Sequence, residues 1–281
     1  MTRTHLPWTF MLLASLTLLA IPAQAAPRDK AVQFVDIGDR QLALRCSGKG
    51  SPTVILEAGL TASSLSWYLV QPGVAAFTRV CSYDRANLGQ SDSVEGPRTA
   101  KDAADDLAAL LMAAHIPGPY ILVGASFGGH IVRLFAAQHP GEIAGIVLVD
   151  ASHEDQEARM AAVLTPDQLR ALDLNASRNI EHMDLAASDK EVKAIGVLPT
   201  ASLVVISAAR DKPVPPGFPD KELNQIWRRL QRDLTKLSAN SVQLIAKKSE
   251  HDIAVDEPDI VVRGVRLAYD AFRSGRLLIQ P

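Results

Sequence analysis

Short apolar runs alternate with longer amphipathic segments along most of this sequence, and this alternation constrains the fold more than any other feature. Runs rich in β-branched residues and leucine predict strands, and apolar positions at helical spacing predict helices between them. The run Ile146-Val147-Leu148-Val149 is apolar throughout, which is typical of a strand buried on both faces of a parallel sheet. The pattern therefore predicts an α/β fold with a mostly parallel sheet flanked by helices.

Eight segments carry the strand pattern, and the first two are joined by a short hairpin signal, Gly38-Asp39. Amphipathic helices are predicted over Thr99–His115 and from Asp256 to Phe272. The predicted strands are Val32–Ile37, Arg40–Cys46, Thr53–Glu57, Arg79–Tyr83, Tyr120–Val123, Ile143–Val149, Leu203–Ser207 and Val242–Ala246.

One stretch, His153 to Leu198, breaks the alternation because it contains helical patterns and no convincing strand. A helical insertion between two strands of the core predicts a cap. The expected organisation is therefore a core of residues 26–152 and 199–281, with a helical cap at 153–198.

The strongest chemical signal is Gly124-Ala125-Ser126-Phe127-Gly128, which follows a predicted strand and precedes a helical run. Gly-x-Ser-x-Gly between a strand and a helix is the nucleophile elbow, in which a serine sits on a sharp turn. Glycines on either side let neighbouring backbone approach closely. The motif predicts Ser126 as a nucleophile, with the backbone N–H of Phe127 as one donor of an oxyanion hole.

The sequence resembles the α/β-hydrolase fold superfamily, in its serine hydrolase branch with a helical cap. Ala125 stands where relatives often carry histidine. Besides the elbow, the resemblance rests on Leu56-Glu57-Ala58-Gly59-Leu60, Tyr83-Asp84-Arg85-Ala86-Asn87-Leu88-Gly89-Gln90-Ser91 and Ser249-Glu250-His251-Asp252.

The resemblance implies roles for residues that lie far from Ser126 in the sequence. His251, between the last predicted strand and the last helix, is expected to be the general base, and the N–H of Leu60 is expected to be the second oxyanion donor. The acid that orients the histidine is expected at Asp211, the usual position in the family, with Asp150 as the alternative. The order Ser, Asp, His along the chain holds for either aspartate.

The resemblance also bears on the two cysteines, Cys46 and Cys81. In the family's strand order the second and fourth strands are neighbours, and these cysteines fall on or beside them. Adjacent strands are close enough for a disulfide where register allows. A Cys46–Cys81 disulfide is therefore expected.

The N-terminal residues 1–25 have the layout of a secretory signal. Arg3 precedes an apolar run from Trp8 to Ile21, and Ala23-Gln24-Ala25 gives a small-x-small cleavage pattern. The run is shorter than the ~20 residues needed to span a bilayer. The expectation is a secreted or periplasmic protein, cut near Ala25, without a stable membrane anchor.

Composition and motifs narrow the function further. The formal net charge of −2 offers no field for nucleic acid, and no metal-ligand spacing or dinucleotide motif is present, so no cofactor or metal is expected. The expected activity is hydrolysis of a small carboxylic ester or thioester through an acyl-enzyme on Ser126. Two alternatives stay open: an iminopeptidase-like amidase, with Glu154, Glu157 or Glu181 holding a substrate amine, and a non-catalytic ligand binder.

Overall fold

A computed structural model of the 281-residue chain describes residues 32–176, 179–198 and 202–278. The predicted signal sequence, residues 1–25, lies outside the described residues. Within the described part, no helix is both long enough and apolar enough to cross a bilayer.

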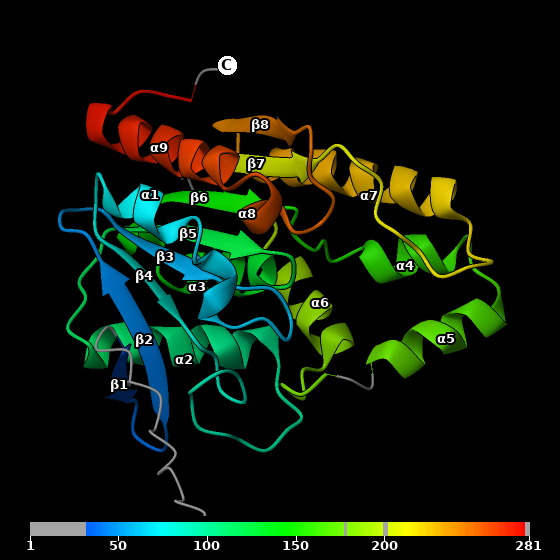
Figure 1. Cartoon of the computed structure of the whole chain (residues 1–281), viewed down its shortest axis with the longest axis horizontal. Helices are drawn as coiled ribbons and strands as arrows, with labels where there is room; N and C mark the ends of the chain where they lie inside the picture. The colour runs from blue at the N-terminus through cyan, green and yellow to red at the C-terminus, as the bar shows by residue number, and fades with distance from the viewer. Residues whose placement is uncertain (1–31, 177–178, 199–201, 279–281) are drawn as a thin grey trace, which may run out of the picture. The chain divides into compact units, whose positions relative to one another are not determined.

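The strands form one eight-stranded sheet in the order β1-β2-β4-β3-β5-β6-β7-β8 (Figure 1). Strand β2 is antiparallel to both of its neighbours, β1 and β4, and all pairs from β4 to β8 are parallel. The predicted mostly parallel sheet is thus confirmed. The strands are β1 Val32–Asp36, β2 Gln41–Ser47, β3 Thr53–Glu57, β4 Val80–Tyr83, β5 Tyr120–Ala125, β6 Ile143–Val149, β7 Ser202–Ala208 and β8 Ser241–Ala246.

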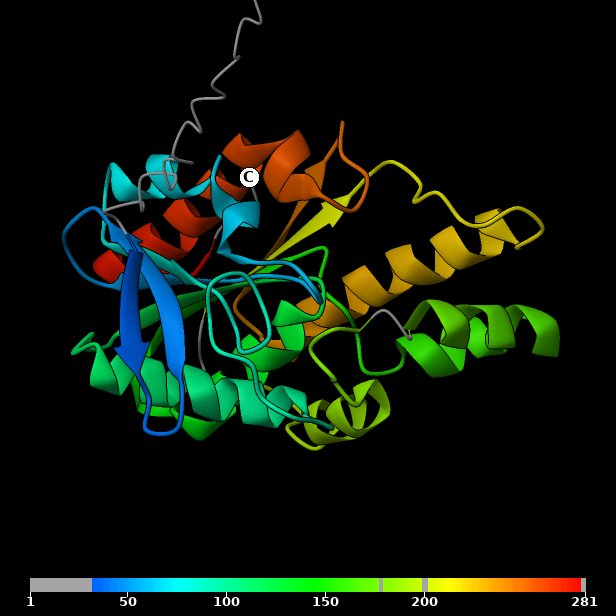
Figure 2. The ribbon, with the colours of Figure 1, turned by 60° about the horizontal axis from the view of Figure 1, so that its bottom comes forward.

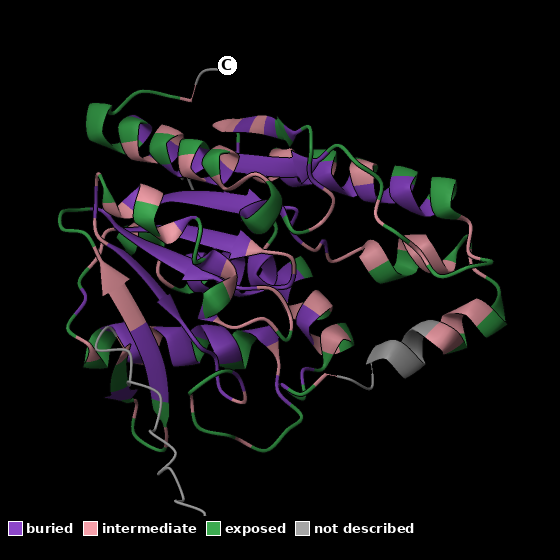
Figure 3. Cartoon of the chain, in the orientation of Figure 1, coloured by how far each residue is buried: buried purple, intermediate pink, exposed green. Residues whose placement is uncertain are grey.

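The central strands are buried along their length, as their apolar runs predict. Every residue of β3, β4 and β7 is buried, whereas the edge strand β8 alternates (Figure 3). Successive residues enter opposite faces, so that Ile121 and Leu122 of β5 belong to two different hydrophobic clusters.

Helices cover both faces of this sheet (Figure 2). One cluster contains residues of α2 and α3, and the other contains residues of α1 and α9. Helix α2 begins with a capping box between Thr99 and Asp102, at the predicted position. The helices are α1 Gln71–Ala75, α2 Ala100–Ala113, α3 Gly128–Gln138, α4 Gln156–Ala161, α5 Pro166–Ala176, α6 Leu185–Lys193, α7 Asp220–Leu234, α8 Ile253–Asp256 and α9 Pro258–Ser274, with short 3₁₀ helices η1 Ser64–Trp67, η2 Pro140–Glu142 and η3 Thr235–Leu237.

The segment between β6 and β7 forms helices α4, α5 and α6. They lie beyond the carboxyl ends of the parallel strands (Figure 1). Among the described residues of this segment, the only extended pairing is an isolated bridge from Met183 to Arg98. The insertion therefore lies at the carboxyl ends of the parallel strands, which is where α/β folds bind their ligands.

Cys46 and Cys81 form a disulfide, as predicted. They lie directly opposite each other in the antiparallel pair of β2 and β4, with Cα atoms 4.1 Å apart. The bridge joins two strands that are adjacent in the sheet and 35 residues apart in the sequence.

Replacing both cysteines by alanine is expected to lower the free energy of unfolding by about 2–4 kcal/mol, because the bridge restricts a loop of this length in the unfolded chain. Urea denaturation of the oxidised wild type and the double variant measures the difference. Thiol titration of the denatured, unreduced wild type should find no free thiol. Equal stability of the two proteins would contradict the prediction.

Candidate active site

Ser126 occupies the tight turn between β5 and α3. Its φ is +48°, in the left-handed region that residues other than glycine rarely adopt. The turn requires glycine on both sides: a Cβ on Gly124 would lie 2.6 Å from the carbonyl oxygen of Gly128, and one on Gly128 would lie 2.5 Å from that of Ala58. The motif thus has the strand, sharp turn and helix that a nucleophile elbow requires.

His251 links Ser126 to a carboxylate. It lies between β8 and α8, with Nε2 3.0 Å from Ser126 Oγ and Nδ1 2.7 Å from Asp150 Oδ2. An ionised carboxylate only accepts hydrogen bonds, so we infer that Nδ1 carries the proton. Nε2 is then free to accept the proton of Ser126.

Asp150, the first residue after β6, is fully buried and has a φ of +40°. Its Oδ1 accepts hydrogen bonds from Trp227 Nε1 at 3.0 Å and from the backbone N–H of Ala208 at 3.2 Å. Burial alone would raise the pKa of this carboxyl. The hydrogen bond from His251 and the charge of Lys212 outweigh burial, so the pKa lies below its usual value.

The expected acid, Asp211, lies outside this hydrogen-bonded set, whereas the alternative, Asp150, is part of it. The side chain of Asp211 is 57% exposed and pairs with Arg228 of α7. Asp211 lies three residues after the end of β7, on the loop that precedes α7. Asp150 instead follows β6 directly, and its positive φ turns the side chain toward His251.

Two residues around Asp150 were missed by sequence reasoning. Trp227 of α7 donates to both carboxylate oxygens at 3.0 Å, and Lys212 Nζ lies 3.7 Å from Oδ2. Trp227 follows Asp150 by 77 positions, so no local pattern connects them. Lys212 follows Asp211 directly in the sequence. The loop after β7 therefore contributes Lys212 to the site, although it does not contribute Asp211.

The backbone donors predicted for an oxyanion hole adjoin Ser126. Leu60 and Ser126 line a pocket of about 140 Å³ together with His251. In the described part of the chain, the N–H groups of Leu60 and Phe127 donate to no other protein group. A Cβ on Gly59 would lie 3.2 Å from Ser126 Cβ, so glycine permits the close approach of this loop.

A buried ionic network holds the loop that contains Leu60. Arg85 donates to the carbonyl oxygens of Ala58 and Gly59 at 2.8 and 2.6 Å, and it also pairs with the carboxylate of Glu57. The same guanidinium binds Glu181 of the insertion at 2.6 Å. Glu181 in turn accepts a hydrogen bond of 2.6 Å from the N–H of Thr61. Arg85 thus fixes the loop and ties it to the insertion.

The acidic side chains considered for binding a substrate amine are placed differently from one another. Glu181 is buried and held by Arg85 and Thr61, and Glu154 pairs with Arg133 at 2.7 Å. Glu157 lies exposed on α4. Two of the three carboxylates are therefore already neutralised within the protein.

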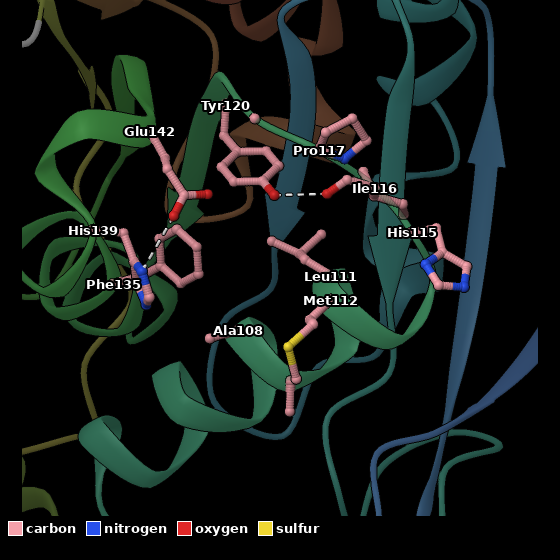
Figure 4. Close-up of a pocket in the computed structure, with 12 residues that line it drawn as sticks. Ala108, Leu111, Met112, His115, Ile116, Pro117, Tyr120, Phe135, His139 and Glu142 are labelled. Carbon is pink, nitrogen blue, oxygen red and sulfur yellow. Dashed lines mark hydrogen bonds and ion pairs between the residues drawn. The ribbon is translucent and has the colours of Figure 1, made fainter.

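A second pocket, of about 760 Å³, is lined by residues of α2, the start of β5 and the end of α3 (Figure 4). Tyr120 at the start of β5, Phe135 and His139 line it, whereas Ser126 follows the end of β5. Ser126, His251 and Asp150 do not line this pocket. Among the described residues, no group of three or more His, Cys, Asp or Glu side chains is placed to hold a metal ion.

Comparison with known proteins supports the fold. The family described as alpha/beta hydrolase fold matches residues 52–188. YqjL, an uncharacterized protein of Bacillus subtilis, is 29% identical over 223 residues, which cover 76% of this chain and 82% of YqjL.

Solved structures share the fold at low sequence identity. Mouse alpha/beta hydrolase domain-containing protein 10 has a TM-score of 0.64 at 17% identity, covering 85% of this chain and 98% of that one. A thermophilic esterase from Thermogutta terrifontis has a TM-score of 0.56 at 20% identity, covering 83% and 94%. The sheet order, the strand–turn–helix motif at Ser126 and these matches together show that the chain has the α/β-hydrolase fold.

Proposed function

We propose that the protein is a serine hydrolase that cleaves small carboxylic esters or thioesters through an acyl-enzyme on Ser126. The observation that carries the proposal is the continuous hydrogen-bonded series from Ser126 Oγ through His251 to Asp150. A serine beside a histidine that a carboxylate orients is the arrangement that activates a hydroxyl for attack on a carbonyl.

In the first half-reaction, Ser126 Oγ attacks the carbonyl carbon while His251 Nε2 takes its proton. The N–H groups of Leu60 and Phe127 hold the oxyanion of the tetrahedral intermediate. The intermediate collapses, the bond to the leaving alcohol or thiol breaks, and His251 returns the proton to that group. Asp150 stays ionised and stabilises the imidazolium that forms between these steps.

In the second half-reaction, water attacks the acyl-enzyme and gives its proton to His251. The bond to Oγ then breaks, Ser126 takes the proton back, and the carboxylic acid leaves. Two structural neighbours are named for related chemistry, the esterase of Thermogutta terrifontis and an enol-lactonase of Burkholderia xenovorans. Their names support ester chemistry over amide chemistry, as do the internal ion pairs of Glu154 and Glu181.

We also propose that the protein works outside the cytoplasm. The Cys46–Cys81 disulfide supports this location, since such bonds persist in oxidising compartments and are rare in the cytosol. The secretory layout of residues 1–25 points the same way.

Intact mass spectrometry after incubation with a fluorophosphonate tests the proposed function. The wild type should gain one adduct and Ser126→Ala none, because the reagent reacts with an activated serine. The unlabelled mass of the exported protein also reports whether the chain starts near Ala26. Short p-nitrophenyl esters and thioesters then identify the substrate class. A folded wild type without an adduct would refute the enzyme proposal and leave ligand binding as the function to test.

A further inference from the structure

Lys212 is a charged residue beside the proposed triad that the reaction steps above do not use. Its Nζ lies 3.7 Å from Asp150 Oδ2 and 3.3 Å from the centroid of the Trp227 ring. The side chain is 24% exposed. It lines a pocket of about 450 Å³ together with His251. The ammonium is thus shared between a carboxylate and an aromatic face.

The protein holds Lys212 in this place through α7. The N–H of Lys212 donates to Asn224 Oδ1 at 2.8 Å, and Asn224 Nδ2 donates to the Lys212 carbonyl at 3.2 Å. Asn224 and Trp227 are three positions apart and therefore lie on one side of the helix. One side of α7 therefore makes three contacts around Lys212. Asn224 binds the backbone of Lys212, and the Trp227 ring lies under its ammonium and also donates to Asp150.

Acidic residues from several elements surround Lys212 or line the pocket that it lines. Asp150 follows β6, while Glu250, Asp252 and Asp256 line the same pocket from the segment around α8. Glu250 is paired with Arg210 at 3.0 Å. Burial lowers the pKa of Lys212 to about 8, although Asp150 and Asp252 act in the opposite direction. The ammonium is therefore charged at neutral pH and loses its charge in mildly alkaline solution.

We propose that Lys212 is a positioning residue, whose ammonium holds Asp150 against Trp227 and keeps His251 neutral in more acidic solution than Asp150 alone would allow. This inference rests on the proposed function. An unopposed carboxylate favours the protonated imidazole, and a cation beside that carboxylate offsets the effect. The free base, which must be neutral to accept the Ser126 proton, is then available at lower pH.

The pH profile of kcat/KM on an activated ester tests the inference. Lys212→Met should move the midpoint of the acidic limb upward by about 0.5–1 pH unit, as expected for one partly screened charge. Lys212→Arg retains the charge and should keep the limb of the wild type. Above about pH 8 the wild-type lysine is neutral as well, so the Lys212→Met and wild-type profiles should converge there.

Lys221→Met, at an exposed position of the same helix α7, is the matched control and should reproduce the wild-type profile. Lys212→Gln supplies a second neutral variant if Lys212→Met does not fold. An active wild type whose acidic limb stays in place in the neutral variants overturns this inference alone, even if kcat falls equally at every pH. A wild type with neither turnover nor fluorophosphonate adduct overturns the proposed function together with this inference.

Discussion

Replacing Asp150 by asparagine is expected to lower kcat about 10⁴-fold, the size of effect known for this change in serine protease triads. The carboxylate oxygen that accepts from His251 Nδ1 at 2.7 Å becomes part of an amide. An amide N–H donated to Nδ1 would place the imidazole proton on Nε2, which is then unable to take the proton of Ser126. The imidazolium that forms during the reaction would also lose its counter-charge.

Asp211→Asn is the matched control for this experiment, because the side chain is exposed and pairs with Arg228 rather than His251. Its kcat should stay within about twofold of the wild type, since surface changes have small effects. Thermal melting of each variant checks that asparagine leaves the fold intact. The reverse ranking, with Asp211→Asn inactive and Asp150→Asn active, would return the role of the acid to Asp211.

Arg85→Met is expected to lower the free energy of unfolding by about 3–5 kcal/mol, because removing one member of a buried ion pair leaves uncompensated charge. Arg85 is the guanidinium between Glu57 and Glu181, and all three side chains are buried. Methionine retains much of the volume but leaves two carboxylates without their cation. The carbonyl groups of the loop before Leu60 also lose their donor.

Urea denaturation of the oxidised protein measures this loss. Arg170→Met is the control, since Arg170 is 68% exposed and its partner Asp167 is also exposed to water. That variant should differ from the wild type by no more than about 0.5 kcal/mol. Equal stability of the two variants would show that the buried network contributes nothing beyond an exposed pair.

The sheet and the sharp turn at Ser126 could be predicted from the sequence because both depend on local patterns. A strand buried on both faces needs an uninterrupted apolar run, and Thr53–Glu57 and Ile143–Val149 have the predicted bounds. The position of Ser126 follows from the steric need for glycine at 124 and 128. Cys46 and Cys81 were paired by their place in the family's strand order, which the register of β2 and β4 confirms.

Only the tertiary structure decided which aspartate contacts His251 and what surrounds that aspartate. Asp150 and Asp211 both lie between Ser126 and His251 in the sequence, so chain order does not separate them. What separates them is the backbone turn after β6, which aims Asp150 at His251, and the Arg228 side chain, which binds Asp211.

The contacts of Trp227 with Asp150, and of Arg85 with Glu181, join residues 77 and 96 positions apart. The sequence by itself determined the strands, the elbow and the candidate residues, because each depends on neighbours along the chain. Only the packing of α7 and of the insertion against the sheet decided which charges meet, because ion pairs depend on distances in space.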